Sequence, residues 1–253
     1  MAKVKITGHA SGSGVITVTA PNTSTDRTIT LPDSTGTILD NTSTLDATKL
    51  SGNLPAISGA SLTSLPNQKV NPNLLINGGF DVAQRGTTVS GIGSAKYTLD
   101  RWNAISSGAD STVTQVSGAT YPKALRLTGA GSTTNTYLQQ RVESKNSRHL
   151  AGGTATFSIN LKASEAKNIE LSLGYAGSED TFSSTTGIVT TTFNMTTTDT
   201  RFTWSGSIPE AATTGIQIEL KVTNQGAVWY EASGAKLELG SVATDFEHRS
   251  YGE

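Results

Sequence analysis

Apolar and polar residues alternate over three separate segments, and this alternation constrains the fold of the chain more than any other feature. Apolar residues occupy every second position at 157–161, 169–175 and 216–222, with polar residues or glycine between them. Side chains alternate between the two faces of a strand, so each segment predicts a strand with one apolar face. Strands of this kind build antiparallel sheets that bury one face. The predicted fold class is therefore all-β, with a C-terminal antiparallel β-sandwich (jelly roll).

The composition agrees with this fold class. The chain of 253 residues contains 26 glycines, and charged residues make up only 15 % of it. Threonine favours strands and glycine favours turns, whereas no helical periodicity extends over a useful length. We expect three parts: a small N-terminal β unit at 1–40, a short stem or linker at 41–72, and the β-sandwich at 73–253.

Residues 1–40 predict a β unit that is too small to be stable alone. Apolar and polar residues alternate at 14–19 and again at 27–31, with Pro21 and Asn22 in the turn between them. A unit of this size has little apolar surface to bury by itself. We therefore expect it to attach to another protein or to a second copy of the chain.

Residues 41–72 combine evenly spaced leucine and isoleucine residues with serine, glycine and proline. Prolines at 55 and 66 argue against one continuous helix. One interpretation is a flexible linker, but flexible linkers carry few large apolar residues. The other is a stem in which three identical segments bury these residues against one another. We favour the stem, which predicts a homotrimer.

The third part opens with the segment NLLINGGFD at 73–81. An apolar triplet ends in Asn-Gly-Gly, and an aromatic residue, Phe80, follows. This order predicts a short strand, then a turn that requires glycine, and then a side chain anchored in the core. The segment therefore marks the start of the larger domain, and its residues are expected to shape the fold.

Several classes of partner and site are excluded by composition. The formal net charge is −1 and no cluster of Lys and Arg is present, which argues against a nucleic-acid partner. The chain contains no cysteine, so it cannot form a disulfide, a thiolate metal site or a cysteine nucleophile. We find neither a signal-peptide core at the N-terminus nor an apolar run of about 20 residues, so no membrane insertion is expected.

No pattern in the sequence indicates catalysis or a cofactor. Cleavage of a polysaccharide requires two carboxylates about 5–9 Å apart. The candidate acids, none of which forms a recognisable pair, are Asp100, Asp110, Glu143, Glu179, Asp180 and Glu231. None of the three histidines, His9, His149 and His248, lies in the context of a catalytic triad. A calcium ion at strand ends is the one alternative left open, with Asp81 and Asp245 as its candidate ligands.

Sugar recognition needs aromatic faces together with polar groups, and the sequence offers both. Tyr121 and Tyr175 lie in or beside predicted loops, and Trp229 must face away from Tyr230 if the two share a strand. Asp100 and Arg101 are polar candidates, although they could equally form an internal ion pair beside Trp102. The predicted carbohydrate-binding residues are Tyr121, Tyr175, Trp229, Asp100 and Arg101. Most aromatic residues of a sandwich belong to its core, which is the competing interpretation for each ring.

Two blocks of sequence resemble a domain common in bacteriophage tail fibres. The opening block comprises NPNLLINGGFDVAQRG (71–86) and YTLDRW (97–102), and the closing block is KLELGSVATDFEHRSY (236–251). The sequence between them is similar in pattern to carbohydrate-binding jelly rolls of the galactose-binding-like kind. Residues 19–23 and 27–36 resemble virion fibre sequence, and residues 49–63 resemble the shafts of trimeric fibres. Related fibres often continue beyond the closing block, whereas this chain stops at Glu253.

This resemblance implies a non-enzymatic structural protein of a phage virion. Residues 1–40 would attach a homotrimer to other virion proteins, and the jelly roll would bind a glycan of the host surface for attachment. Such a protein is assembled in the host cytoplasm and is then located in the virion, on a tail fibre or on the capsid surface. A capsid decoration or head-fibre protein is the first alternative, and a polysaccharide depolymerase is the second.

Overall fold

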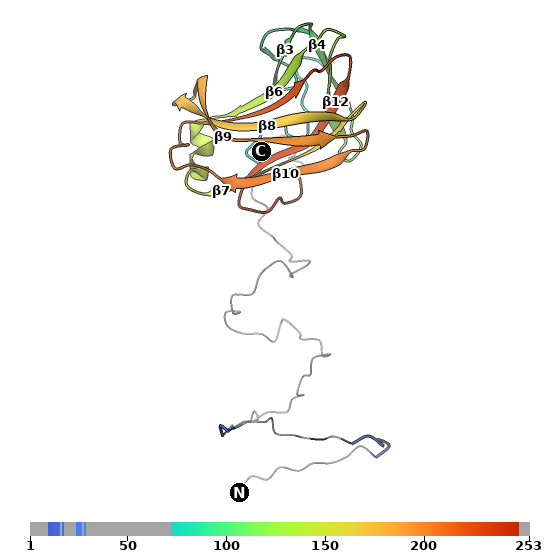
Figure 1. Ribbon diagram of the computed structural model, residues 1–253, viewed down its shortest axis with the longest axis vertical. Coiled ribbons are helices and arrows are strands. Elements are labelled where there is room, and N and C mark those ends of the chain that lie inside the picture. Colours follow the sequence, from blue (N-terminus) through green and yellow to red (C-terminus); the bar gives the residue numbers. More distant parts are fainter. Residues whose placement is uncertain (1–9, 16, 18–23, 27, 29–71, 248–253) are drawn as a thin grey trace. The chain divides into compact units, whose positions relative to one another are not determined.

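The computed structural model describes residues 10–15, 17, 24–26, 28 and 72–247 (Figure 1). Half of the predicted strand at 14–19, most of the predicted strand at 27–31 and all of the predicted stem except residue 72 lie outside these residues. Those residues before position 30 that are described are exposed, with Val15 at 89 %. The boundary at residue 40 and the trimeric stem therefore stay predictions.

Residues 72–247 form a sandwich of two antiparallel β-sheets, each with six strands, which confirms the predicted all-β fold (Figure 1). Sheet A has the order β1 (Thr88–Ile92), β4 (Ser111–Ser117), β5 (Lys123–Thr128), β12 (Trp229–Leu239), β7 (Thr154–Ala163) and β10 (Thr200–Ser207). Sheet B has the order β2 (Lys96–Tyr97), β3 (Asn103–Ser107), β6 (Asn135–Val142), β11 (Ile216–Thr223), β8 (Lys167–Ser178) and β9 (Thr181–Met195). A single helical turn, α1 (Ser144–Ser147), and the 3₁₀ helix η3 (Arg148–Leu150) follow β6.

The core lies between the two sheets and is built from the apolar positions of the alternating segments. Phe157, Ile159 and Leu161 of β7 are fully buried, as are the apolar residues of β11. Trp102 is also fully buried, and its ring centroid lies 5.0 Å from that of Phe80. The predicted anchor role of Phe80 is thus confirmed.

The polar face of β7 is buried too, which the alternation alone does not predict. Ser158 and Asn160 are nearly inaccessible, because Arg201 of β10 lies across them. The Arg201 guanidinium donates to Ser158 Oγ at 2.6 Å and to Asn160 Oδ1 at 3.2 Å. Burial lowers the pKa of Arg201 from its ordinary value, although nearby acidic groups partly oppose this. Hydrogen bonding, not exposure to water, satisfies these polar groups.

The opening segment at 73–81 contains the predicted turn, but the residues before the turn do not form the predicted short strand. It runs beside the second half of β12 and is fixed there by Asn73, whose Nδ2 donates to the Ala235 carbonyl at 2.8 Å and whose Oδ1 accepts from Leu237 N at 3.0 Å. The backbone takes the left-handed conformation at Asn77 and Phe80. Gly78 is required for a different reason, since a Cβ there would overlap the carbonyl oxygen of Ala235.

The closing block covers the outer face of β12. Lys236 and Glu238 point to that face and are fully buried beneath the segment that follows β12. Lys236 Nζ donates to the Asp245 carbonyl at 3.0 Å, and Thr244 N donates to Glu238 Oε1 at 2.8 Å. The opening and closing blocks thus meet at the same strand. Within the described ranges no helix is both long enough and apolar enough to span a membrane.

Candidate functional site

The outer face of sheet B carries a continuous strip of polar side chains. Asn103 of β3 pairs with Gln139 of β6, Gln139 pairs with Glu219 of β11, and Glu219 pairs with Ser172 of β8. The residues on either side of each of these positions point into the core, so these four point away from it. The strip therefore presents amide, hydroxyl and carboxylate groups side by side across four strands.

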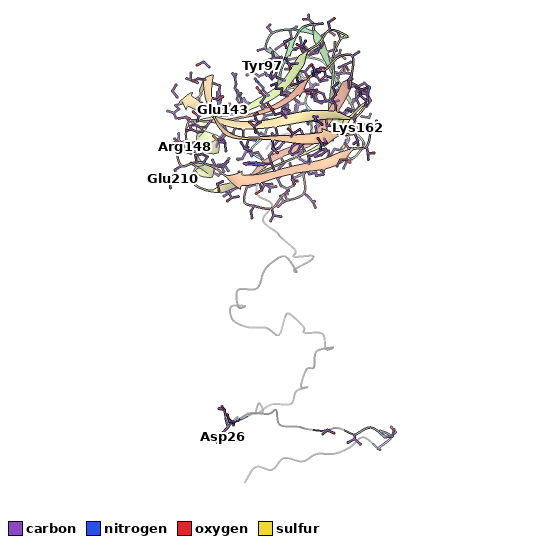
Figure 2. The ribbon with its side chains drawn as sticks, viewed as in Figure 1. Asp26, Tyr97, Glu143, Arg148, Lys162 and Glu210 are labelled. Carbon is purple, nitrogen blue, oxygen red and sulfur yellow. The ribbon has the colours of Figure 1, made fainter. Side chains whose placement is uncertain are left out.

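One end of this strip is hollowed into a pocket of about 240 Å³, which we call the Tyr97 pocket. Its lining residues are Tyr97, Arg101, Asn103, Gln139, Arg141, Glu143, Asp180 and Phe182. Tyr97 is 50 % exposed (Figure 2), and Phe182 comes from the β9 side of the pocket. The volume lies just below the range of about 300–1,000 Å³ that is usual for small-molecule sites. The pocket is therefore suited to a small ring or to one unit of a longer chain.

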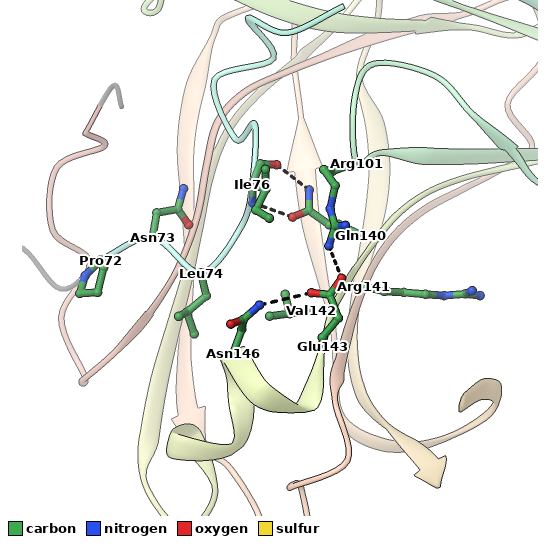
Figure 3. A pocket seen from close by; sticks show the side chains of 10 residues that line it. All are labelled: Pro72, Asn73, Leu74, Ile76, Arg101, Gln140, Arg141, Val142, Glu143 and Asn146. Carbon is green, nitrogen blue, oxygen red and sulfur yellow. Dashed lines mark hydrogen bonds and ion pairs between the residues drawn. The ribbon is translucent and has the colours of Figure 1, made fainter. Parts of the chain in front are cut away.

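A second pocket of about 260 Å³ adjoins the first, and we call it the Ile76 pocket (Figure 3). It shares Arg101, Arg141 and Glu143 with the Tyr97 pocket. The Gln140 side chain accepts from Ile76 N at 2.8 Å and donates to Ile76 O at 2.9 Å, which fixes the opening segment against β6. Figure 3 shows Arg141 extending away from the other side chains that line the Ile76 pocket.

Arg101 and Glu143 form an ion pair at the border between the two pockets. Arg101 Nη2 lies 2.5 Å from Glu143 Oε1, and both side chains are about two-fifths exposed. The Arg101 backbone has a φ of 71°, a left-handed conformation that costs a non-glycine residue of order 1–3 kcal/mol. Burial alone would raise the pKa of Glu143, but the hydrogen bond and the charge of Arg101 hold it below the ordinary value of 4.5. The pair is therefore charged at neutral pH.

This lowered pKa predicts how acid affects the ion pair. Because the folded-state pKa of Glu143 lies below the unfolded value, the pair stabilises the fold above about pH 4.5 and loses this contribution as the pH falls through the folded-state pKa. We expect Glu143→Gln to lower the free energy of unfolding by less than about 1 kcal/mol near pH 6, since the pair is exposed, and to have a smaller effect near pH 3. Urea unfolding at both pH values measures this, and an equal penalty at both would contradict the assignment.

Three further groups give the Tyr97 pocket its binding chemistry. The Oδ1 atom of Asn103 is buried and has no hydrogen-bond partner within the described residues. The Arg85 guanidinium lies over the Tyr97 ring at 5.6 Å, and that of Arg141 lies over the Phe182 ring at 5.2 Å. The pocket thus combines two aromatic rings with an unused acceptor and cationic donors, a combination that can hold a hydroxyl-rich ring.

Of the predicted polar binding residues, Arg101 lies in the Tyr97 pocket and Asp100 does not. The Asp100 carboxylate accepts from Gln84 N at 2.7 Å, outside both pockets. The alternative of an internal ion pair between Asp100 and Arg101 is wrong, because Arg101 pairs with Glu143.

The three predicted aromatic residues lie elsewhere. Tyr121 packs edge-on against Phe246, and Tyr175 is half-buried against the core. Trp229 faces away from the buried Tyr230, as predicted, and lies on the outer face of sheet A with the Arg126 guanidinium 4.3 Å from its ring. Trp229 is thus a separate candidate surface, and the structure does not bring it together with Arg101.

The candidate calcium ligands lie close to the closing block. A Cβ on Gly79 would meet both the Asp81 carboxylate and the Phe246 ring, and Asp245 contributes its backbone carbonyl to Lys236. Across the ranges that the structure describes, no group of three or more His, Asp and Glu residues is arranged to hold a metal ion.

Seven residues of the Tyr97 pocket were not among the predicted binding residues. Two of them, Glu143 and Asp180, are candidate acids of the sequence, and the other five are Tyr97, Asn103, Gln139, Arg141 and Phe182. Two of these five, Gln139 and Arg141, stand at alternate positions of β6. Alternation of this kind indicates that the two side chains point away from the core, but it does not indicate which outward-facing side chains line a pocket. The pairing of β3 with β6 and of β6 with β11 was the missing information.

Two of the candidate acids, Glu143 and Asp180, line the Tyr97 pocket. A general acid for glycoside cleavage needs a raised pKa, whereas that of Glu143 is lowered by Arg101. Asp180 accepts from Ser144 N at 2.6 Å and from Ser144 Oγ at 3.2 Å. These two carboxylates are thus engaged in local structure.

Comparison with known proteins gives a similarity of fold. No family model matches the chain, and no curated protein matches it. Among solved structures, the enzymatically active domain of tailspike protein 4 from bacteriophage CBA120 has a TM-score of 0.47 at 12 % identity, over 66 % of this chain and 21 % of that one. A putative sugar binding protein from Bacteroides thetaiotaomicron VPI-5482 has a TM-score of 0.47 at 14 % identity, over 67 % of this chain and 100 % of that one. The carbohydrate-binding module CBM4 has a TM-score of 0.44 at 16 % identity, over 65 % of this chain and 99 % of that one.

Proposed function

We propose that the sandwich is a glycan-binding domain and that the Tyr97 pocket with the adjoining polar strip is its binding surface. The exposed Tyr97 ring at the rim of a pocket that also contains an unpartnered buried acceptor is the observation that carries this proposal. A sugar ring stacks its C–H face on an aromatic ring, and its hydroxyls exchange hydrogen bonds with amide and carboxylate groups. Asn103, Gln139 and Glu219 supply such groups beside the ring.

The proposed activity is binding without cleavage. The carboxylate that pairs with Arg101 is poorly suited to donate a proton at neutral pH, because its pKa is lowered. Incubation of the protein with a polysaccharide that it binds should therefore release no new reducing ends. A steady release of reducing ends that Glu143→Gln abolishes would instead identify a depolymerase.

We further propose that the protein is a homotrimeric fibre of a phage virion, attached through residues 1–40 and displaying the sandwich towards the host. The resemblance of residues 71–86, 97–102 and 236–251 to tail-fibre sequence supports this, together with the leucine spacing at 41–72. Three linked sites would raise the avidity of weak sugar binding by about 10²–10⁴. Images of labelled particles test the location, and label between capsomers would favour a capsid decoration protein. Light scattering tests the trimer.

Replacing Tyr97 with alanine is expected to weaken glycan binding by at least roughly tenfold, because the stacking face at the rim is lost. The glycan is first identified on an array of bacterial surface polysaccharides, and its affinity is then measured by isothermal titration calorimetry.

Trp229→Ala is the matched control, because Trp229 is a second partly exposed aromatic residue on the outer face of the other sheet. We expect it to leave the affinity unchanged. Loss of binding in Trp229→Ala with normal binding in Tyr97→Ala would move the site to sheet A.

A further inference from the structure

Two arginines that border the Tyr97 pocket make no ion pair within the described residues. Arg85 and Arg141 are both exposed, and each guanidinium lies over an aromatic ring of the pocket. Among the residues that the structure describes, Arg141 makes one hydrogen bond, in which its Nε donates to Gln217 Oε1 at 3.0 Å. Its two terminal nitrogens are therefore left free to donate to a ligand. Arg101, by contrast, is neutralised by Glu143.

The acidic residues nearby are already engaged. Glu143 is paired with Arg101, the Asp180 carboxylate accepts two hydrogen bonds from Ser144, and Glu219 accepts a hydrogen bond from Gln139. Asp180 and Glu219 keep their negative charges, but their oxygens already accept hydrogen bonds, whereas the terminal nitrogens of Arg141 keep unused N–H donors at the rim of the pocket. A guanidinium that is stacked on a ring is held in one plane, and this favours the approach of a planar anion with two oxygens.

We propose that the glycan recognised by the Tyr97 pocket is acidic and that Arg141 binds its anionic group. This inference rests on the proposed glycan binding and specifies its chemical class. A sugar carboxylate accepts from the terminal nitrogens of Arg141, while a hydroxyl of the same unit or of its neighbour donates to Asn103 Oδ1. Arg141 and Asn103 line the same pocket, so one bound unit engages both. Arg85 lies over Tyr97 and adds positive charge where the chain leaves the pocket.

The test uses the full chain and a panel of polyuronates, namely polygalacturonate, alginate and hyaluronate, each compared with its carboxyl-reduced form. The reduced polymers keep the same backbone and lose only the negative charge. Calorimetry is expected to show binding to at least one polyuronate and at least roughly tenfold weaker binding to its reduced form. Raising the salt concentration from about 0.05 M to about 0.5 M should weaken binding to the polyuronate and leave binding to its reduced form unchanged.

Arg141→Gln is expected to bring the affinity for the polyuronate down to that for the reduced polymer, and Arg141→Lys is expected to retain part of the difference. Arg148→Gln is the matched control, because Arg148 is a similarly exposed arginine that pairs with Glu179 at 3.2 Å and lies outside both pockets. The unfolding midpoint of each variant shows whether it is folded.

The outcomes separate this inference from the proposed function. Equal binding of the acidic and reduced polymers, sensitive to Tyr97→Ala but not to Arg141→Gln, would overturn the acidic ligand and keep the glycan site. Binding to dextran sulfate or to polyuronates that is insensitive to Tyr97→Ala would identify charge attraction alone and would overturn the inference. No binding to any neutral or acidic polymer would overturn both.

Discussion

Replacing Lys236 with methionine is expected to lower the free energy of unfolding of the sandwich by about 3–5 kcal/mol, because it leaves a buried carboxylate without its partner. Lys236 Nζ lies 3.4 Å from Glu238 Oε2, and both side chains are fully buried. Methionine fills a similar volume, so the loss of stability would result from the unpaired charge and not from a cavity. Urea unfolding followed by tryptophan fluorescence measures the change.

The closing block is expected to loosen in the same variant. Thr244 Oγ1 donates to Glu238 Oε2 at 2.6 Å and accepts from Lys236 Nζ at 2.5 Å, so this one hydroxyl joins the segment after β12 to both buried charges. Without Lys236, Thr244 Oγ1 loses the hydrogen bond that it accepts from the lysine. Amide exchange around Thr244 should therefore rise in Lys236→Met before the sheets themselves open.

A double substitution separates the ion pair from ordinary packing. Lys236→Met combined with Glu238→Leu removes both charges, and replacing a buried pair by apolar residues is often neutral. We expect the double variant to recover most of the stability that the single variant loses. The exposed pair between Arg148 and Glu179 is the contrasting case, where Arg148→Ala should cost no more than about 0.5 kcal/mol. A double variant as unstable as the sum of its single variants would contradict this account.

The sandwich could be predicted from the sequence because its strands repeat with a period of two. Ile169, Leu171 and Leu173 alternate with polar residues, and the structure places all three in the core. The pattern is local, so it can be read without knowing which strand lies beside which. The role of Phe80 could also be predicted from a local pattern, because an isolated aromatic residue directly after a glycine turn is expected to pack in the core.

The open site could not be predicted in this way, because its residues come from several strands whose pairing the pattern does not contain. Ser158 and Asn160 of β7 look the same in sequence as Gln139 and Arg141 of β6. The first two are buried under Arg201. Gln139 is buried as well, and only Arg141 is exposed, at the Tyr97 pocket. What separates them is coverage by residues distant in the chain. Tyr121 was predicted to bind a ligand and instead packs against Phe246 for the same reason.

Gly78→Ala is expected to destabilise the sandwich by about 3 kcal/mol, because the close approach of the opening segment to β12 leaves no room for a Cβ. A Cβ on Gly78 would overlap the Ala235 carbonyl oxygen and would also lie 2.9 Å from Asn73 Nδ2. These are the two atoms of the hydrogen bond that Asn73 makes to β12. The Ala235 N–H donates to Gly78 O at 2.9 Å, so the segment cannot move away without losing that bond as well.

Gly131→Ala is the control for this substitution, because a Cβ on Gly131 has nothing within 4 Å and its φ is not left-handed. It should be neutral or stabilising by up to about 1 kcal/mol through the unfolded state. Urea unfolding compares the two variants at equal protein concentration. Equal stability of Gly78→Ala and the unmodified chain would mean that the segment packs less tightly on β12 than its hydrogen bonds indicate.

Asn73→Ala provides the second half of a double-mutant cycle. Alone it should cost about 2–3 kcal/mol, since three buried hydrogen bonds end on the Asn73 side chain: one to Ala235 O and two from the N–H groups of Leu75 and Leu237. Removing that side chain also removes one of the atoms that a Cβ on Gly78 would meet. The double variant should therefore be less unstable than the sum of the two single variants, by at least about 0.5 kcal/mol. Strict additivity would show that Gly78 and Asn73 stabilise the opening segment independently of each other.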